Sequence, residues 1–242
     1  MKKILFSLTC VFSSIMMNAQ SLNHVGFFPT IDHSGTINNK LDYSLYYFAQ
    51  IHAYNDEINN QTEPTGLFVF YSEQALHYKL NNRIALTGSY VYERQYPFEN
   101  NYRNENRFYV QATYKYPLSK ATVKHRLRFD GRFVENRLTG ENPFTHRIRY
   151  LTGISTPIGK KDKYYFTAYN EFFFNTYKGA TVKYAENWAA AAIGIKTGKN
   201  SSVEAGPLYI FWVNDNIGTL NNFYYLQLAW VSHINFQKKQ QQ

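Results

Sequence analysis

Apolar and polar residues alternate along much of the chain. The stretch VKHRLRFDGRF, residues 123–133, shows the pattern clearly, because every second side chain is charged and most of the others are apolar. The charged members are Lys124, Arg126, Arg128, Asp130 and Arg132. Successive side chains of a β-strand point to opposite faces, so this stretch predicts a strand with one charged and one apolar face.

The same period of two recurs in ten or eleven segments. They are 24–37, 41–54, 66–80, 83–96, 105–118, 121–135, 145–158, 163–175, 186–197, 201–213 and 222–236. A typical strand of a soluble protein has about five or six residues. A tilted strand that crosses a membrane needs about 9–11. Most of these segments are long enough to cross a membrane and project beyond it.

The connections between the segments alternate between short and long. Short polar turns are predicted at 38–40, 81–82, 119–120, 159–162 and 198–200, and longer polar loops at 55–65, 97–104, 136–144, 176–185 and 214–221. Outer-membrane barrels have short periplasmic turns and longer extracellular loops. No linker or change of composition interrupts the pattern, so residues 20–242 are expected to form one barrel domain.

The number of strands is open at this point. The ten segments from 41–54 to 222–236 close evenly, whereas segment 24–37 gives eleven, and bacterial barrels normally have an even count. We expect this segment to lie in the lumen or the periplasm, or a further short strand to give twelve. Pro29 in its middle is unfavourable for a paired strand. The predicted fold is all-β, a transmembrane antiparallel up-and-down barrel of about 10–12 strands.

Residues 1–19 have the pattern of a cleaved signal peptide. Lys2 and Lys3 precede an apolar run from Ile4 to Met17, and Ala19 offers a small residue for cleavage. The only cysteine, Cys10, lies in this run, and lipid attachment there is an alternative that would need an unusually short apolar segment. The mature chain would leave the cytoplasm without disulfides. The predicted location is the outer membrane.

Composition narrows the expected partners. The chain has a formal charge of +9, 18% aromatic residues and a mean hydropathy of −0.47. A basic protein can bind nucleic acid, but export and the lack of a nucleic-acid motif argue against it. We expect contact with outer-membrane lipid, and with the barrel-assembly machinery, which recognises a final strand with a terminal aromatic such as segment 222–236. A monomer is expected.

The polar faces of neighbouring segments predict a belt of charge in the lumen. Centring the turns places Glu93 opposite Arg107 and Arg149 opposite Glu171, with Asp130 near both arginines. Opposite charges on adjacent strands stabilise a sheet by a few tenths to about 1 kcal/mol per pair. The predicted belt consists of Glu93, Arg107, Arg126, Arg128, Asp130, Arg132, Arg147, Arg149 and Glu171.

Two interpretations of the belt are open. A barrel of this size has an interior mostly filled by side chains, so the charges can simply form a hydrated core. The alternative is a narrow path for small solutes, in which the surplus of Lys and Arg favours anions.

Three motifs add a resemblance. HRLRFDGRF (125–133), HRIRYLTGIS (146–155) and NEFFFN (170–175) resemble a family of uncharacterised Gram-negative outer-membrane β-barrel proteins, classified as a domain of unknown function. The resemblance covers nearly the whole mature chain, from the signal peptide to the closing aromatic strand. It implies an outer-membrane barrel and carries no activity, substrate or catalytic residue.

No motif predicts catalysis, a cofactor or a metal. Some small barrels modify lipids with a nucleophilic Ser and a His base. The adjacent pairs His33-Ser34 and Ser232-His233 point to opposite faces, so neither is a dyad, and only a cross-strand Ser leaves this alternative open. The sequence lacks Cys ligands and His-rich metal motifs.

The predicted function is a structural or passive-transport role in the outer membrane, for small solutes and with a preference for anions. Two alternatives remain. One is a lipid hydrolase or acyltransferase, and the other is binding through loops, for which Tyr96-Pro97-Phe98 is the candidate segment.

Overall fold

The computed structural model describes residues 21–58, 61–62, 64–137, 139–159, 163–176, 181–214 and 219–237. The predicted signal peptide, 1–19, lies outside these residues. Within them, no helix is long and apolar enough to cross a membrane.

All regular elements of the described residues are strands. Their bounds are β1 Ser21–Thr36, β2 Leu41–Asn55, β3 Glu57–Ile58, β4 Gln61–Thr62, β5 Gly66–Lys79, β6 Ile84–Gln95, β7 Arg103–Leu118, β8 Ala121–Val134, β9 Phe144–Ile158, β10 Tyr164–Thr176, β11 Val182–Lys196, β12 Ser201–Asn214 and β13 Thr219–Asn235. The alternating pattern therefore predicted the position of each long strand to within a few residues.

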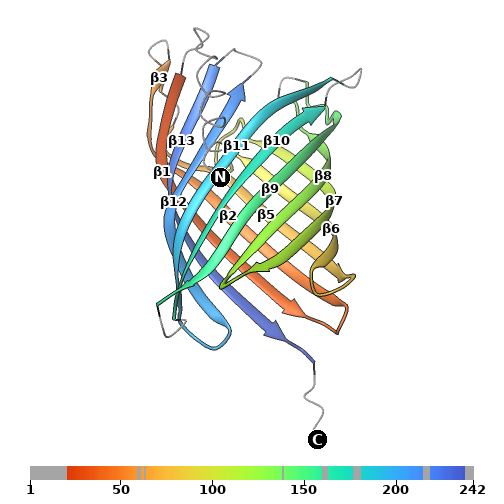
Figure 1. Ribbon diagram of the computed structural model, residues 1–242. Helices are drawn as coiled ribbons and strands as arrows, with labels where there is room; N and C mark the ends of the chain where they lie inside the picture. The colour runs from red at the N-terminus through yellow and green to blue at the C-terminus, as the bar shows by residue number, and fades with distance from the viewer. Residues whose placement is uncertain are drawn as a thin grey trace, which may run out of the picture.

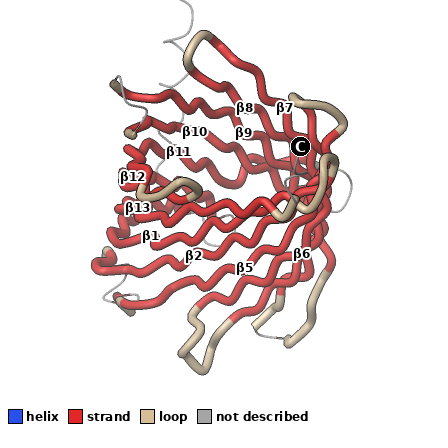
Figure 2. Tube along the Cα trace, turned by 90° about the horizontal axis from the view of Figure 1, so that it is seen from below, coloured by secondary structure: helices blue, strands red, loops and turns tan. Residues whose placement is uncertain are grey.

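The eleven long strands form a closed barrel (Figures 1 and 2). The strand order is β1-β13-β12-β11-β10-β9-β8-β7-β6-β5-β2, and β2 pairs with β1 to close the ring. The short β3–β4 hairpin lies outside it. We call the end of the barrel that carries the connections 37–40, 80–83, 119–120, 159–163 and 197–200 the turn end, and the opposite end the loop end.

The predicted all-β barrel of 10–12 strands is confirmed, and the expectation of an even count is wrong. Segment 24–37 is part of the wall as β1, which runs from the loop end to the turn end and pairs in parallel with β13. An odd number of up-and-down strands must place two parallel neighbours side by side where the ring closes. The β12–β13 connection is also shorter than predicted, because β12 ends at Asn214 and β13 begins at Thr219.

Pro29 is accommodated by a local interruption of the sheet. Its neighbour on β13 is Leu228, whereas pairing of β1 with β2 stops at Phe27 and resumes at Thr30. Proline has no N–H to donate to a ladder, so it is tolerated where these rungs are missing. The unfavourable residue is thus placed at a gap in the β1–β2 ladder.

The two faces of the wall differ in polarity. The outer face exposes large apolar side chains from most strands, among them Val110 at 64%, Leu127 at 56% and Phe108 at 56%. The interior contains an aromatic cluster contributed mainly by β1, β2, β5, β12 and β13, in which Phe48 stacks on Phe28 and Tyr71. The buried charged side chains come mainly from β7–β10.

Candidate functional site: the charged interior of the barrel

A cavity of about 1390 Å³ occupies the interior and is lined by residues from both ends of the barrel. Asn81 and Arg83 line it at the turn end, and Arg103 and Pro143 line it at the loop end. Its basic lining residues are Lys79, Arg83, Arg103, Arg107, Lys115, Lys124, Arg126, Arg128, Arg132, Arg147 and Arg149. Its acidic ones are Asp32, Asp42, Glu73, Glu93, Glu171, Glu186 and Glu204.

The structure places the nine residues of the predicted belt on the interior side of the wall. Eight of them line the cavity, and the ninth, Asp130, is completely buried. They come from β6, β7, β8, β9 and β10, which are consecutive neighbours in the barrel. Alternation along each strand accounts for this arrangement, because residues two apart share a face.

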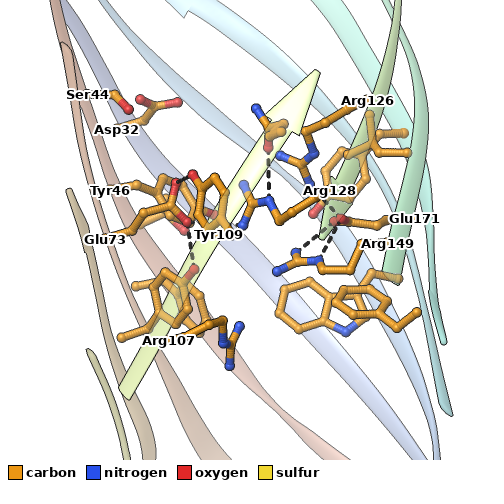
Figure 3. Close-up of a pocket in the computed structure, with 18 of the residues that line it drawn as sticks. Asp32, Ser44, Tyr46, Glu73, Arg107, Tyr109, Arg126, Arg128, Arg149 and Glu171 are labelled. Carbon is orange, nitrogen blue, oxygen red and sulfur yellow. Dashed lines mark hydrogen bonds and ion pairs between the residues drawn. The ribbon is translucent and has the colours of Figure 1, made fainter. Parts of the chain in front are cut away.

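Glu171 on β10 joins two arginines from neighbouring strands (Figure 3). Its Oε1 accepts a hydrogen bond from Arg126 Nη2 at 2.6 Å and from Arg149 Nε at 2.9 Å, and its Oε2 accepts from Arg149 Nη2 at 3.1 Å. The side chain of Glu171 is 3% exposed. A carboxylate removed from water needs such partners, and here each partner bond is charge-assisted.

Glu105 on β7 joins a second pair of arginines. Arg107 Nε donates to Glu105 Oε1 at 2.8 Å, and Arg132 donates through Nε and Nη2 at 2.6 and 2.7 Å. Arg107 and Arg132 are direct cross-strand neighbours, an arrangement of like charges that is unfavourable by itself. The carboxylate of Glu105 lies between the two guanidinium groups and offsets their mutual repulsion. Each of the two Arg–Glu–Arg triads contains two cations and one anion.

Glu73 on β5 connects the charged and the aromatic halves of the interior. It accepts hydrogen bonds from the hydroxyls of Tyr71 and Tyr109, each at 2.6 Å, and from Arg128 Nη1 at 3.3 Å. The Arg128 guanidinium also lies 3.7 Å from the centre of the Tyr109 ring, within the range of a cation–π interaction. Figure 3 shows Glu73 facing Tyr109 across the cavity from Glu171.

Arg147 completes the network on the β10–β11 side. Its Nη2 lies 2.9 Å from Glu186 Oε1, and its Nε donates to Asn175 Oδ1 at 2.7 Å. Glu186 also accepts from Trp188 Nε1 at 3.1 Å. The charged network therefore extends from β5 to β11.

The predicted cross-strand partners differ from the observed ones by two residues. Glu93 lies opposite Glu105 rather than Arg107, and Glu171 lies opposite Leu151 rather than Arg149. The predicted ion pairs still form, but diagonally, with Arg107 Nη2 at 3.1 Å from Glu93 Oε2. Because each turn is centred one residue away from the assumed point, the partner moves by two positions and stays on the same face.

Asp130 lies on the face of the predicted belt but forms none of the ion pairs found among the described residues. Its cross-strand neighbours are Tyr109 and Arg147, and neither of its carboxylate oxygens has a hydrogen-bond partner among the described residues. Besides Glu93 and Glu171, the carboxylates that pair with the arginines are Glu73, Glu105 and Glu186, which the predicted belt does not include. Glu105 could have been found, since it precedes Arg107 by two residues and must share its face.

Two lysines of the cavity lining, Lys115 and Lys124, form no ion pair among the described residues. Lys124 lines the cavity, and among the described residues no carboxylate lies within ion-pair distance of its ammonium group. The six arginines of the predicted belt, by contrast, are all ion-paired. No group of three or more His, Cys, Asp or Glu suited to a metal ion occurs in the described part of the chain.

The fold and its interior define a closed β-barrel with an apolar outer face and an arginine-rich lumen. Residues 31–221 match the model of the family described as "Protein of unknown function (DUF2490)", and the chain belongs to this family. No curated protein matches the chain. No solved structure matches it either.

Proposed function

We propose that the protein is a barrel of the bacterial outer membrane, and that its lumen is a passage for small polar solutes with a modest preference for anions. The observation that carries the proposal is the interior cavity, which is lined by residues from both ends of the barrel. A passage for solutes needs open space that extends between the two ends of the barrel, whereas an interior filled by side chains would have no such space.

The outer face supports a position in lipid. Soluble monomers rarely expose contiguous apolar patches larger than a few hundred Å², and here apolar residues are exposed on strands throughout the ring. Polar side chains that face lipid are unfavourable, and a Lys or Arg near the midplane costs about 2–4 kcal/mol. The outward residues Asn170 and Asn187 satisfy each other, because their side-chain amides are hydrogen bonded to each other at 3.1 and 3.0 Å.

The charge of the lumen supports the preference for anions. The basic side chains that line the cavity outnumber the acidic ones, and the triad of Arg126, Glu171 and Arg149 retains one positive charge. The preference is modest because most guanidinium groups are already paired with carboxylates. Lys124 lines the cavity without an ion pair among the described residues, so it is a cation available to a passing solute.

Single-channel recording in a planar bilayer tests the proposal. The protein without residues 1–19, folded as judged by heat-modifiable gel migration, is expected to give steady currents, with a reversal potential in a KCl gradient that indicates a preference for chloride. Lys124→Gln should reduce this preference, while Lys120→Gln, which changes an exposed turn outside the cavity lining, should leave it unchanged. A folded barrel without currents would contradict the proposal.

A further inference from the structure

The parallel pairing of β1 with β13 brings a serine and a histidine together on the outer face. His33 is the cross-strand neighbour of Ser232, and its Nδ1 lies 2.8 Å from Ser232 Oγ. The other ring nitrogen, Nε2, lies 2.9 Å from the hydroxyl oxygen of Tyr43 on β2. Both His33 and Ser232 point outward, since their sequence neighbours Asp32 and His233 line the cavity.

The same pairing forms a second contact on the cavity side. Ser34 Oγ lies 3.0 Å from His233 Nδ1, and His233 Nε2 lies 3.2 Å from Thr36 Oγ1. Each histidine therefore contacts the serine of the other strand where β1 pairs with β13: His33 contacts Ser232, and His233 contacts Ser34. The inner contact provides a matched control for the outer one, because the two use the same residue types on the same two strands.

The outer contact has the arrangement of an activated nucleophile. A serine hydroxyl becomes reactive when a base within hydrogen-bond reach takes its proton and a third group orients that base. With the histidine proton on Nε2, Ser232 donates to Nδ1, and Nε2–H donates to the Tyr43 oxygen. Tyr43 is a positioning residue in this arrangement, because it acts through the histidine.

An apolar groove of about 440 Å³ lies next to this contact on the same face of the wall. Its outer lining includes Ile31, Val203, Leu228 and Trp230, and it opens where Pro29 interrupts the β1–β2 ladder. Ile31 and Trp230 are cross-strand neighbours and precede His33 and Ser232 by two residues on their strands. Two residues along a strand span roughly 7 Å, so the groove ends beside the serine.

We propose that Ser232 and His33 form an esterase site on the outer face of the barrel, whose substrate is the ester of a long acyl chain that lies in this groove. The occupant is a membrane lipid, because the groove has an apolar lining and faces the lipid in the proposed location. The inference rests on that location and is independent of conduction through the lumen.

The reaction follows ordinary acyl transfer. Ser232 Oγ attacks the ester carbonyl while His33 takes the hydroxyl proton, and the ester C–O bond then breaks and the proton passes to the leaving alcohol. Water attacks the acyl-serine and loses a proton to His33, the acyl C–Oγ bond breaks, and the proton passes from His33 to Ser232 Oγ, which releases the fatty acid and restores the serine. One ester and one water are consumed, and no oxidant or cofactor is required.

The first test uses the folded protein without residues 1–19 in detergent micelles, with p-nitrophenyl palmitate as substrate and an alkyl fluorophosphonate as the labelling probe. We expect hydrolysis, and a phosphonyl adduct that mass spectrometry locates on Ser232. Ser232→Ala should lower hydrolysis by about 100-fold or more, and His33→Gln by a similar factor. Ser34→Ala, the matched inner variant, should retain activity.

Two further variants test the groove and the positioning residue. Val203→Trp fills the groove, so it should reduce hydrolysis of p-nitrophenyl palmitate while p-nitrophenyl acetate is hydrolysed as before. Tyr43→Phe should lower kcat and leave KM unchanged, because it removes the partner of His33 Nε2 and does not touch the acyl chain.

The position of the phosphonyl adduct on the protein without substitutions tests the role of Ser232 even if a variant fails to fold. A folded barrel that neither hydrolyses the palmitate ester nor forms an adduct overturns the proposal. So does an adduct on another residue, or an equal loss of activity in Ser34→Ala and Ser232→Ala, since either would show that the outer serine has no particular role.

Discussion

Glu105 and Glu171 are the side chains on which the charge balance of the interior depends most. Each accepts hydrogen bonds from two arginines, and each is almost fully removed from water, with side chains 3% exposed. Breaking a buried ion pair by removing one partner costs about 3–5 kcal/mol, because the remaining charge is left without compensation. Substitution of Glu171 would leave Arg126 and Arg149 without a carboxylate partner among the described residues, and substitution of Glu105 would do so for Arg132, while Arg107 would keep Glu93.

We therefore expect Glu105→Gln to lower the free energy of unfolding by about 3 kcal/mol. Glu93→Gln should cost about 1 kcal/mol or less, since the Glu93 side chain is more exposed and makes only one ion pair, with Arg107. Urea unfolding in lipid vesicles measures both. Glu141→Gln, on an exposed loop, is the control. Equal effects of the first two variants would contradict the central position assigned to Glu105.

Asp56 provides a pH-dependent contact at the loop end. The backbone N–H and the side-chain amide of Asn23 both donate to its Oδ2 at 2.8 Å, and these bonds hold the pKa of the Asp56 carboxyl below its ordinary value. A carboxyl whose pKa is lowered on folding adds stability above its unfolded pKa, about 3.9 for aspartate, and loses that contribution as the pH falls further.

The expected result is a difference in unfolding free energy between the unmodified protein and Asp56→Asn that is constant from pH 7 to 5 and shrinks towards pH 3. Urea unfolding at each pH measures it, with Glu99→Gln on an exposed loop as the control. A difference that grows as the pH falls would have the wrong sign for this contact.

At two places the hydrogen-bond ladder is irregular beside a glycine that lies very close to the backbone of the neighbouring strand. The β1–β2 register shifts next to Gly26, and the β11–β12 ladder is missing at Gly206 and Pro207. A Cβ on Gly206 would lie 2.0 Å from the carbonyl oxygen of Ala191, and one on Gly26 would lie 1.9 Å from that of Ile51. Glycine is required at both positions because the neighbouring backbone leaves no room for a side chain.

Gly206→Ala is accordingly expected to destabilise the barrel by about 1–3 kcal/mol, the usual cost of overpacking. Gly88→Ala is the matched control, since a Cβ at Gly88 meets nothing within 4 Å. The two variants can be compared by the temperature at which heat-modifiable migration is lost. If both were tolerated equally, the close approach at Gly206 would not constrain the sheet.

The strands could be predicted from the sequence because alternation is a local property, whereas their pairing could not. The assignment of Arg126 and Glu171 to the interior depends only on which face of its own strand each occupies. The partner of Glu93 depends on the centre of a loop, and the parallel neighbour of β1 depends on how the ring closes. The contact of His33 with Ser232 follows from that closure, so no pattern within either strand indicated it.

In the molecule as a whole, the two faces of the barrel wall differ in polarity. Its outer face is apolar on strands around the ring, and its inner face combines an aromatic cluster with a network of arginines and carboxylates. Both proposals depend on this division, because a solute path needs a wet interior and an acyl chain needs a lipid exterior.

Thiol accessibility on β8 distinguishes a wall with a lipid-facing exterior and a wet interior from one without this division. The chain after residue 19 contains no cysteine, so Lys124→Cys places a single thiol on the cavity lining and Leu127→Cys places one on the exposed outer face. In lipid vesicles, a charged methanethiosulfonate reagent is expected to modify Lys124→Cys quickly and Leu127→Cys slowly. Fast modification of Leu127→Cys together with protection of Lys124→Cys would contradict a lipid-facing exterior around a water-filled lumen.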